Sequence, residues 1–201
     1  SIRKLKLNIE APELWTDKEL MDLATELRHK SKPTIIAANK IDIKGSEKNL
    51  EKIKKEFPNY KIIPCSADSE LALRECLKKE LIKYIPGENK FEIINNDLNE
   101  KQKNALDFIQ KQVLSKYNST GVQDLLDTAI FDLLNYIAVF PGGMNNLKDS
   151  SGKVLPDCFL IPNGSTALDF AFKIHTDIGN NFIKAFDVKK RIVIGKEHKL
   201  K

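Results

Sequence analysis

Three polar side chains follow a short apolar run, and their types suit the recognition of a purine base. The run from Thr34 to Ala38 is typical of a buried strand, and it passes directly into Asn39-Lys40-Ile41-Asp42. Asn39 could bond the N7 edge of the base, while the stem of Lys40 lies along the ring face. An ionised Asp42 only accepts hydrogen bonds, so it could receive both N1–H and the 2-amino group of guanine. Adenine offers neither donor, so the motif predicts guanine.

A second motif stands at the end of the next strand-like run. The segment from Tyr60 to Cys65 is followed at once by Ser66 and Ala67. Open α/β sheets place their ligands at the carboxyl ends of parallel strands, so both motifs should reach one edge. A strand ending in Ser-Ala is where GTPases place a second backbone contact to the base. The nucleotide base-binding residues predicted here are therefore Asn39, Lys40, Asp42, Ser66 and Ala67.

Length and composition indicate a folded protein in an aqueous compartment. The 201 residues are 41% hydrophobic and 30% charged, enough for one ample domain or two small ones. The apolar runs are too short and too polar to span a bilayer, and the N-terminus lacks the order of a signal peptide. We therefore expect no membrane partner and a cytoplasmic location.

Cysteine and histidine usage predicts neither a metal site nor a catalytic residue. The three cysteines are odd in number and lack Cys-x-x-Cys spacing, which argues against a disulfide framework or a zinc site. The three histidines lie far apart with no nearby carboxylate pattern: His29, His175 and His198. His175 follows an apolar helical face, where packing or capping is the better interpretation.

The charge balance favours an anionic partner only mildly. The net charge is +5 and the isoelectric point is about 8.9, but most lysines alternate with glutamates as on a solvated surface. Lys173 and the run Lys189-Lys190-Arg191 could contact RNA phosphates. A solvated face is the alternative, because the aromatic residues of a single-strand platform are missing. Recognition of a DNA sequence is not expected.

The first ninety residues alternate between helices and strands. A capping box at Thr16–Glu19 begins a helix that stops before Pro33, and Ser46 caps a helix between the two strand-like runs. A third helix should then carry Leu73, Leu77, Leu81 and Ile85 on one face and end at Pro86-Gly87. Residues 1–90 are thus expected to be the C-terminal part of a doubly wound α/β sheet.

The remaining chain divides into two further segments. Residues 91–134 carry a helix capped within Asp97–Glu100 and a second helix after Gly121, and we interpret them as a helical connector. Residues 135–201 predict strands at 136–140, 158–161 and 191–194, a turn at 149–152, and a helix capped by Ser165 or Thr166. This is the plan of a small α+β β-grasp domain, whose closing strand, expected after Leu200, is missing.

These segments together resemble a known family. The chain is similar to the C-terminal half of archaeal members of the YchF group of Obg-related GTPases, which end in a ubiquitin-like TGS domain. The motifs that carry the resemblance span the chain: Ala37–Asp42, Pro64–Ala67, Glu70–Arg74, Tyr84–Gly87, Ser119–Gln123, Phe131–Leu134, Gly152–Asp157, Gly164–Thr166 and Ala171–Gly179. The resemblance implies a GTP/GDP switch coupled to ribosome or RNA binding, with Mg²⁺ at the phosphates.

The phosphate-binding half of such a GTPase is not present in this sequence. A Gly-x-x-x-x-Gly-Lys-Ser/Thr loop, a switch threonine and an Asp-x-x-Gly for Mg²⁺ are absent. Gly152-Lys153 lacks the loop that would cradle a phosphate, and Asp149–Gly152 is interpreted as a hairpin turn. The Mg²⁺ ligands are therefore expected outside this chain, which should be inactive alone as a hydrolase.

Two hypotheses of different class follow. In the first, the chain is the base-recognition half of a guanine-nucleotide hydrolase. In the second, it is a non-hydrolysing RNA- or ribosome-binding adaptor that works through residues 135–201. The first predicts that changing Asp42 alters the choice of base, and the second predicts salt-sensitive RNA binding without nucleotide affinity.

Overall fold

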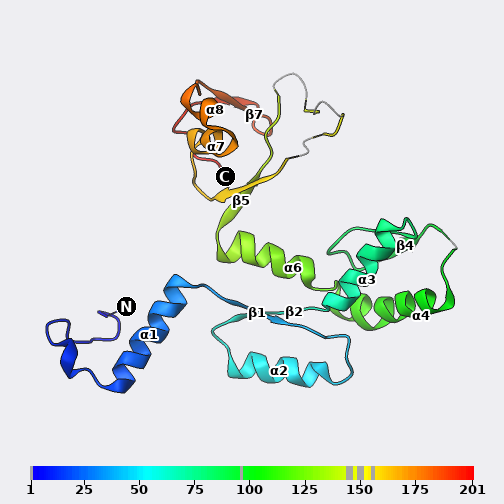
Figure 1. The fold of residues 1–201 in the computed structure, drawn as a ribbon, viewed down its shortest axis with the longest axis horizontal. Coiled ribbons are helices and arrows are strands. Elements are labelled where there is room, and N and C mark those ends of the chain that lie inside the picture. The colour runs from blue at the N-terminus through cyan, green and yellow to red at the C-terminus, as the bar shows by residue number, and fades with distance from the viewer. Residues whose placement is uncertain (1, 96, 144–146, 149–151, 155–156) are drawn as a thin grey trace. The chain divides into compact units, whose positions relative to one another are not determined.

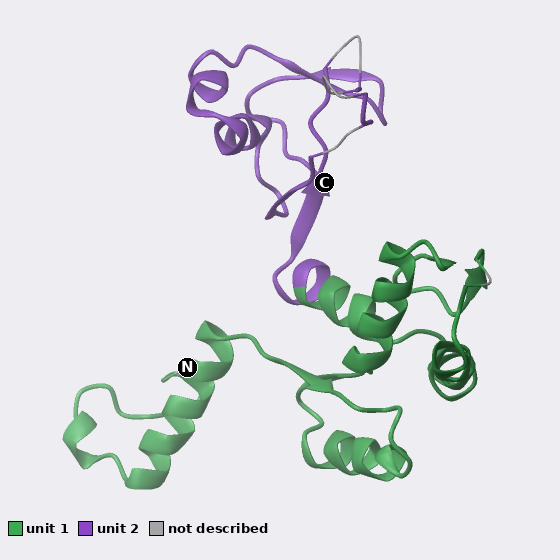
Figure 2. Cartoon of the chain, turned by 45° about the vertical axis from the view of Figure 1, so that its right-hand side comes forward, with its two compact units in different colours: residues 1–129 green, residues 130–201 purple. Residues whose placement is uncertain are grey.

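The computed structural model describes residues 2–95, 97–143, 147–148, 152–154 and 157–201. It forms two compact units, residues 1–129 and 130–201 (Figure 2). The division falls inside a π-helical turn, Thr128–Leu133. The boundaries at residues 90 and 134 that the sequence suggests stay predictions. No helix among the described residues has the length and apolar character needed to cross a membrane.

The two strands that precede the base motifs pair side by side in unit 1. Strands β1 (Ile35–Ala38) and β2 (Lys61–Pro64) run parallel, in register from Ile35 opposite Lys61 to Ala38 opposite Pro64 (Figure 1). Helix α2 (Ser46–Glu56) makes the crossover between them. Parallel pairing confirms that both motifs leave the sheet at the same edge.

Helix α2 begins differently from the prediction that Ser46 would cap it. The N-cap is Gly45, in a left-handed conformation with φ +87°, and it offers no side-chain cap. Ser46 is instead the first helical residue, and its hydroxyl donates to the carbonyl of Ile41 at 2.9 Å. The serine therefore fastens the helix to the loop that carries the first base motif.

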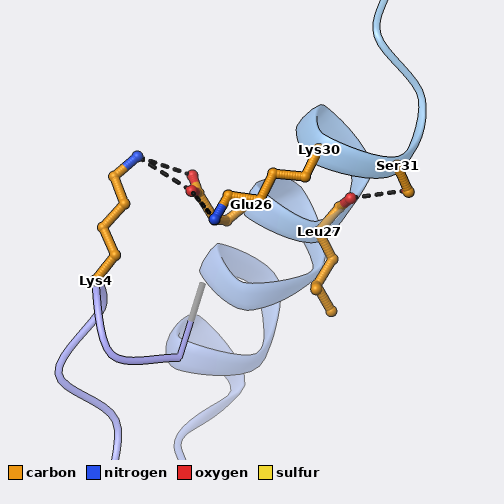
Figure 3. Close-up of polar contacts among 5 residues, drawn as sticks. All are labelled: Lys4, Glu26, Leu27, Lys30 and Ser31. Carbon is orange, nitrogen blue, oxygen red and sulfur yellow. Dashed lines mark hydrogen bonds and ion pairs between the residues drawn. The ribbon is translucent and has the colours of Figure 1, made fainter. Parts of the chain in front are cut away.

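The N-terminal region contains the 3₁₀ turn Pro12–Leu14 and helix α1 (Asp17–Ser31). The predicted capping box is confirmed, because Thr16 and Glu19 satisfy each other's backbone N–H groups. Figure 3 shows Lys4 bound to both carboxylate oxygens of Glu26, at 3.1 and 3.2 Å. The hydrogen bond from Lys4 holds the pKa of Glu26 below its ordinary range.

The third helix is shorter than the leucine spacing suggested. Helix α3 (Ala67–Lys78) ends in a Schellman motif, in which Glu80 adopts φ +55° and the N–H of Leu81 reaches the carbonyl of Cys76 at 3.0 Å. The chain then forms β3 (Ile82–Tyr84), which pairs antiparallel with β4 (Phe91–Ile93). The prediction that Leu81 and Ile85 belong to the helix was therefore wrong.

A helical array completes unit 1. Its elements are α4 (Glu100–Ile109), a π-helical turn at Gln110–Leu114, α5 (Ser115–Tyr117) and α6 (Val122–Asp127). Asn99, within the predicted 97–100 segment, caps α4 in a capping box with Gln102. The core lies where α3, β3 and α4 meet, and its buried members are Leu73, Leu81, Ile82, Tyr84, Leu98, Leu106, Ile109 and Leu114.

Unit 2 has mixed helices and hairpins. Strands β5 (Tyr136–Val139) and β6 (Phe159–Pro162) pair antiparallel, as do β7 (Ala185–Asp187) and β8 (Ile192–Ile194). Between the pairs lie α7 (Ala167–Ile174) and α8 (Thr176–Asn180).

Several details of unit 2 were predicted, but helix α8 was not. Of the two candidate caps for α7, Thr166 is the one used, in a capping box with Asp169. His175 accepts from the N–H of Asp177 at 3.2 Å and so caps α8. Strand β7 was not predicted. The turn expected at 149–152 lies largely outside the described residues.

Candidate nucleotide-binding site

The two predicted base motifs meet at the carboxyl ends of β1 and β2. The N–H of Cys65 donates to the carbonyl of Ala38 at 3.0 Å, and the N–H of Ile41 donates to the carbonyl of Cys65 at 3.3 Å. These bonds continue the pairing of the strands into the loops beyond them. Residues from the two motifs are therefore held within hydrogen-bond distance of one another.

Asn39 joins the motifs through its side-chain oxygen. Oδ1 accepts from the N–H of Lys40 at 2.8 Å and from the N–H of Ala67 at 3.1 Å. Because the oxygen serves as the acceptor, the side-chain amide nitrogen is the part of Asn39 that remains to donate. Asn39 is exposed, so that nitrogen can meet an acceptor such as a purine N7.

Asp42 is oriented by the second motif. The Ser66 hydroxyl donates to Asp42 Oδ1 at 2.6 Å, and Ser66 itself is completely buried. The same hydroxyl accepts from the N–H of Ser69, so Ser66 is also the N-cap of α3. One buried serine thus begins a helix and fixes a half-exposed carboxylate at the edge of the sheet.

Lys40 adopts an unusual backbone conformation within the first motif. Its φ is +69°, in the left-handed region that side-chain-bearing residues seldom occupy. Such strain persists only where surrounding contacts impose it. Here those contacts are the bond to Asn39 and the N–H of Ile43, which donates to the Lys40 carbonyl at 3.2 Å. The chain therefore turns at Lys40, directly before Ile41 and Asp42.

A third segment, which sequence reasoning did not assign to the site, supports the second motif from behind. The N–H of Ser66 donates to the carbonyl of Thr120 at 2.8 Å. Gly121, with φ +76°, lies so close to β2 that an added Cβ would be 1.9 Å from the carbonyl oxygen of Pro64. Only glycine fits this approach. The signal available in the sequence was the family-like stretch Ser119–Gln123, but nothing in it indicated which strand it contacts.

The residues considered for RNA contact lie in unit 2 and in separate elements. Lys173 is exposed in the last turn of α7, and Lys189, Lys190 and Arg191 form the exposed turn between β7 and β8. Lys190 is held there by Asp187, which accepts from its N–H at 3.0 Å and pairs with its Nζ at 3.5 Å. The backbone bond from Lys190 is the main reason why the pKa of Asp187 is lowered.

The part of the chain that the structure describes holds no cluster of three His, Cys, Asp or Glu residues placed to bind a metal ion. The acidic residue of the site, Asp42, accepts from Ser66 instead. The side chains gathered at this edge are an amide, a lysine and one carboxylate.

Comparison with known protein families shows to which family the chain belongs. Residues 37–142 match the family model described as Obg-like GTPase YGR210-like, G4 motif-containing domain, and residues 147–201 match the TGS domain. The chain belongs to the Obg-like GTPases. The match to the G4 domain contains both base motifs and the segment around Gly121. The match to the TGS domain covers most of unit 2.

Individual relatives agree with the family. The chain is 49% identical to an uncharacterized GTP-binding protein of Methanocaldococcus jannaschii, over 96% of this chain and 49% of that protein. It is 30% identical, over 56% of this chain and 27% of the other, to a protein of Buchnera aphidicola named ribosome-binding ATPase YchF. The crystal structure of a GTP-binding protein from Pyrococcus horikoshii is similar with a TM-score of 0.66 and 36% identity, over 100% of this chain and 52% of that one. The chain thus spans about half the length of these GTP-binding relatives.

Proposed function

We propose that this chain is the guanine-recognition half of a GTP-binding protein. The observation that carries the proposal is the joining of Asn39 to Ala67 and of Asp42 to Ser66 by hydrogen bonds between the two motifs. Both pairs lie at the open end of a parallel strand pair, where α/β folds bind ligands. The hydrogen bonds between the motifs hold Asn39 and Asp42 in place, and side chains already held in place lose less conformational freedom on binding a nucleotide.

The proposed roles follow from the chemistry of each group. The Asn39 amide nitrogen donates to N7, and the Asp42 carboxylate accepts from N1–H and the 2-amino group of guanine. The Lys40 stem covers one face of the ring, and Ala67 acts through its N–H, which holds the Asn39 side chain in place. Adenine presents the acceptor N1 to the Asp42 carboxylate, so the hydrogen bond to this charged group is lost together with most of the binding free energy that it contributes.

Phosphates and Mg²⁺ would be held by residues outside this stretch in the natural full-length protein. Mg²⁺ with GTP typically neutralises charge on the β- and γ-phosphates in such proteins. In this proposal the full-length protein hydrolyses the nucleotide, and the 201 residues of this chain select the base.

The test is direct titration of the full-length protein with GDP and ADP. We expect GDP to bind at least about a hundredfold more tightly, as for sites whose polar groups would be left unpaired by the wrong ligand. Asn39→Ala should weaken GDP binding, whereas Asn49→Ala, an exposed asparagine in α2, should not. Equal affinities for GDP and ADP would refute guanine recognition.

We further propose that unit 2 contacts RNA phosphates through the exposed turn Lys189–Arg191. The name of the YchF relative, which is called ribosome-binding, supports a nucleic-acid partner. Replacing Lys189 and Arg191 by glutamate should reduce the slope of log affinity against log salt by about two, because each phosphate contact releases roughly one counterion. Lys52→Glu combined with Lys54→Glu, both exposed in α2 of unit 1, is the control matched in charge, and an unchanged slope in the variant of Lys189 and Arg191 would contradict this role.

A further inference from the structure

A buried glutamate behind the second base motif receives three hydrogen bonds. Glu70, in α3, is only 4% exposed. Its Oε1 accepts from Arg74 Nε at 2.6 Å, and its Oε2 accepts from the Tyr84 hydroxyl at 2.9 Å and the Thr120 hydroxyl at 2.6 Å. The donors come from α3, β3 and the loop before α6, so one carboxylate connects three elements.

The carboxylate is ionised in this environment. Burial raises the pKa of Glu70, but the hydrogen bonds from Thr120, Arg74 and Tyr84 outweigh that effect and leave the pKa below its ordinary value. An ionised carboxylate only accepts, so each neighbouring hydroxyl must point its hydrogen at Glu70. A buried charge with several donors costs much energy to disturb, which makes the arrangement stiff.

Thr120 connects Glu70 to the candidate base site through hydrogen bonds. It is completely buried, its hydroxyl donates to Glu70, and its carbonyl accepts from the N–H of Ser66 at 2.8 Å. Ser66 in turn donates its hydroxyl to Asp42 at 2.6 Å. A continuous series of three hydrogen bonds therefore leads from Glu70 to the carboxylate proposed to read guanine.

We propose that Glu70 is a positioning residue for guanine recognition, acting through Thr120 on the Ser66-Ala67 turn. The inference rests on the proposed function and deepens it, because it assigns the base preference partly to a buried network that never touches the nucleotide. Loss of the Thr120 hydroxyl would leave its carbonyl free to turn from Ser66. Asp42 would then lose the alignment that lets it accept from two donors of guanine at once.

The readout is base discrimination, measured as the ratio of dissociation constants for IDP and GDP with the full-length protein. Inosine lacks only the 2-amino group, so the ratio isolates the second bond to Asp42. In the wild type we expect a ratio of at least about ten, the value of one hydrogen bond to a charged group. A general loss of folding lowers the active fraction for both nucleotides equally and leaves the ratio unchanged.

Three variants and one control make the test specific. Thr120→Val keeps the shape without the hydroxyl and should lower the ratio at least about threefold, a loss of part of one such bond. Thr120→Ser restores the hydroxyl and should restore the ratio. Glu70→Gln preserves the volume and one acceptor oxygen of the side chain, and it should also lower the ratio. It therefore decides the test if Thr120→Val does not fold. Glu75→Gln removes an exposed charge from the same helix and should change nothing.

The outcomes separate the two proposals. If the wild type binds IDP and GDP equally, Asp42 gains nothing from the 2-amino group and the inference fails, whereas the proposed function fails only if GDP and ADP also bind equally. If the wild type prefers GDP and both Thr120→Val and Glu70→Gln keep its ratio, guanine recognition stands and the positioning role of Glu70 is refuted.

Discussion

Replacing Asp42 with asparagine should change which base the protein prefers, with little change in its fold. The Ser66 hydroxyl donates to Oδ1 of Asp42 at 2.6 Å, and an amide oxygen at that position can accept the same bond. The side chain should therefore keep its place in the half-exposed loop. The substitution changes one acceptor into an NH₂ donor at the edge that faces the base.

The size of the effect follows from counting bonds at that edge. With guanine, one of the two bonds to the carboxylate is lost and two donors are brought face to face. A hydrogen bond to a charged group contributes about 1.5–3 kcal/mol, so GDP should bind roughly 10- to 150-fold more weakly. Xanthine carries a carbonyl at C2 in place of the amino group, so its diphosphate should bind the variant more tightly than the wild type.

The assay is competition between GDP and XDP on the full-length protein, with wild type, Asp42→Asn and Asp68→Asn compared side by side. Asp68 is exposed in the first turn of α3, so its variant removes a charge close to the site without touching the proposed base edge. Thermal unfolding of all three checks that the fold is kept. An unchanged ratio of GDP to XDP affinity in Asp42→Asn would refute guanine reading by this residue.

Three other perturbations test the framework around the site. Gly121→Ala should lower the melting temperature and weaken GDP binding, because the new Cβ would lie 1.9 Å from the Pro64 carbonyl oxygen and φ +76° alone costs about 1–2 kcal/mol. Thr166→Ala should lower the unfolding free energy of unit 2 by about 1 kcal/mol by removing the cap of α7, as measured by denaturant titration; no loss would show that the capping box is dispensable. Burial and the bond to Glu70 raise the pKa of Tyr84 from 10.0 to about 12. The unfolded chain therefore releases this proton first, stability should fall between pH 10 and 12, and Tyr84→Phe should flatten that fall in denaturation curves measured across this range.

The placement of the base motifs could be predicted because it depends on local patterns. Two apolar runs, each followed by polar residues, are enough to predict parallel strands whose ends meet. The capping boxes at Thr16 and Thr166 were equally readable, since each depends on residues three positions apart. The comparisons confirm the family and the fold class that these patterns suggested.

The end of α3 could not be read in the same way. Leu73, Leu77, Leu81 and Ile85 repeat every four residues, and that period indicates one continuous helical face. The helix stops because Glu80 takes a left-handed conformation that is usually assigned to glycine, so the sequence gives no stop signal there. Leu73 and Leu81 are buried, whereas Leu77 and Ile85 are exposed, so the apolar pattern identified two core positions and gave the wrong secondary structure beyond Lys78.

The loop before α6 contacts Ser66, which lies more than fifty residues earlier in the chain. A contact between residues so far apart leaves no local pattern, so the sequence indicated the two base motifs but not the loop that holds them. Ser119 donates to Asp124 in the first turn of α6 at 2.5 Å, and the N–H of Gly121 donates back to Ser119 at 2.9 Å. The same loop holds Ser66 through Thr120. Displacing α6 would therefore remove the Thr120 carbonyl from Ser66 and release the turn that orients Asp42.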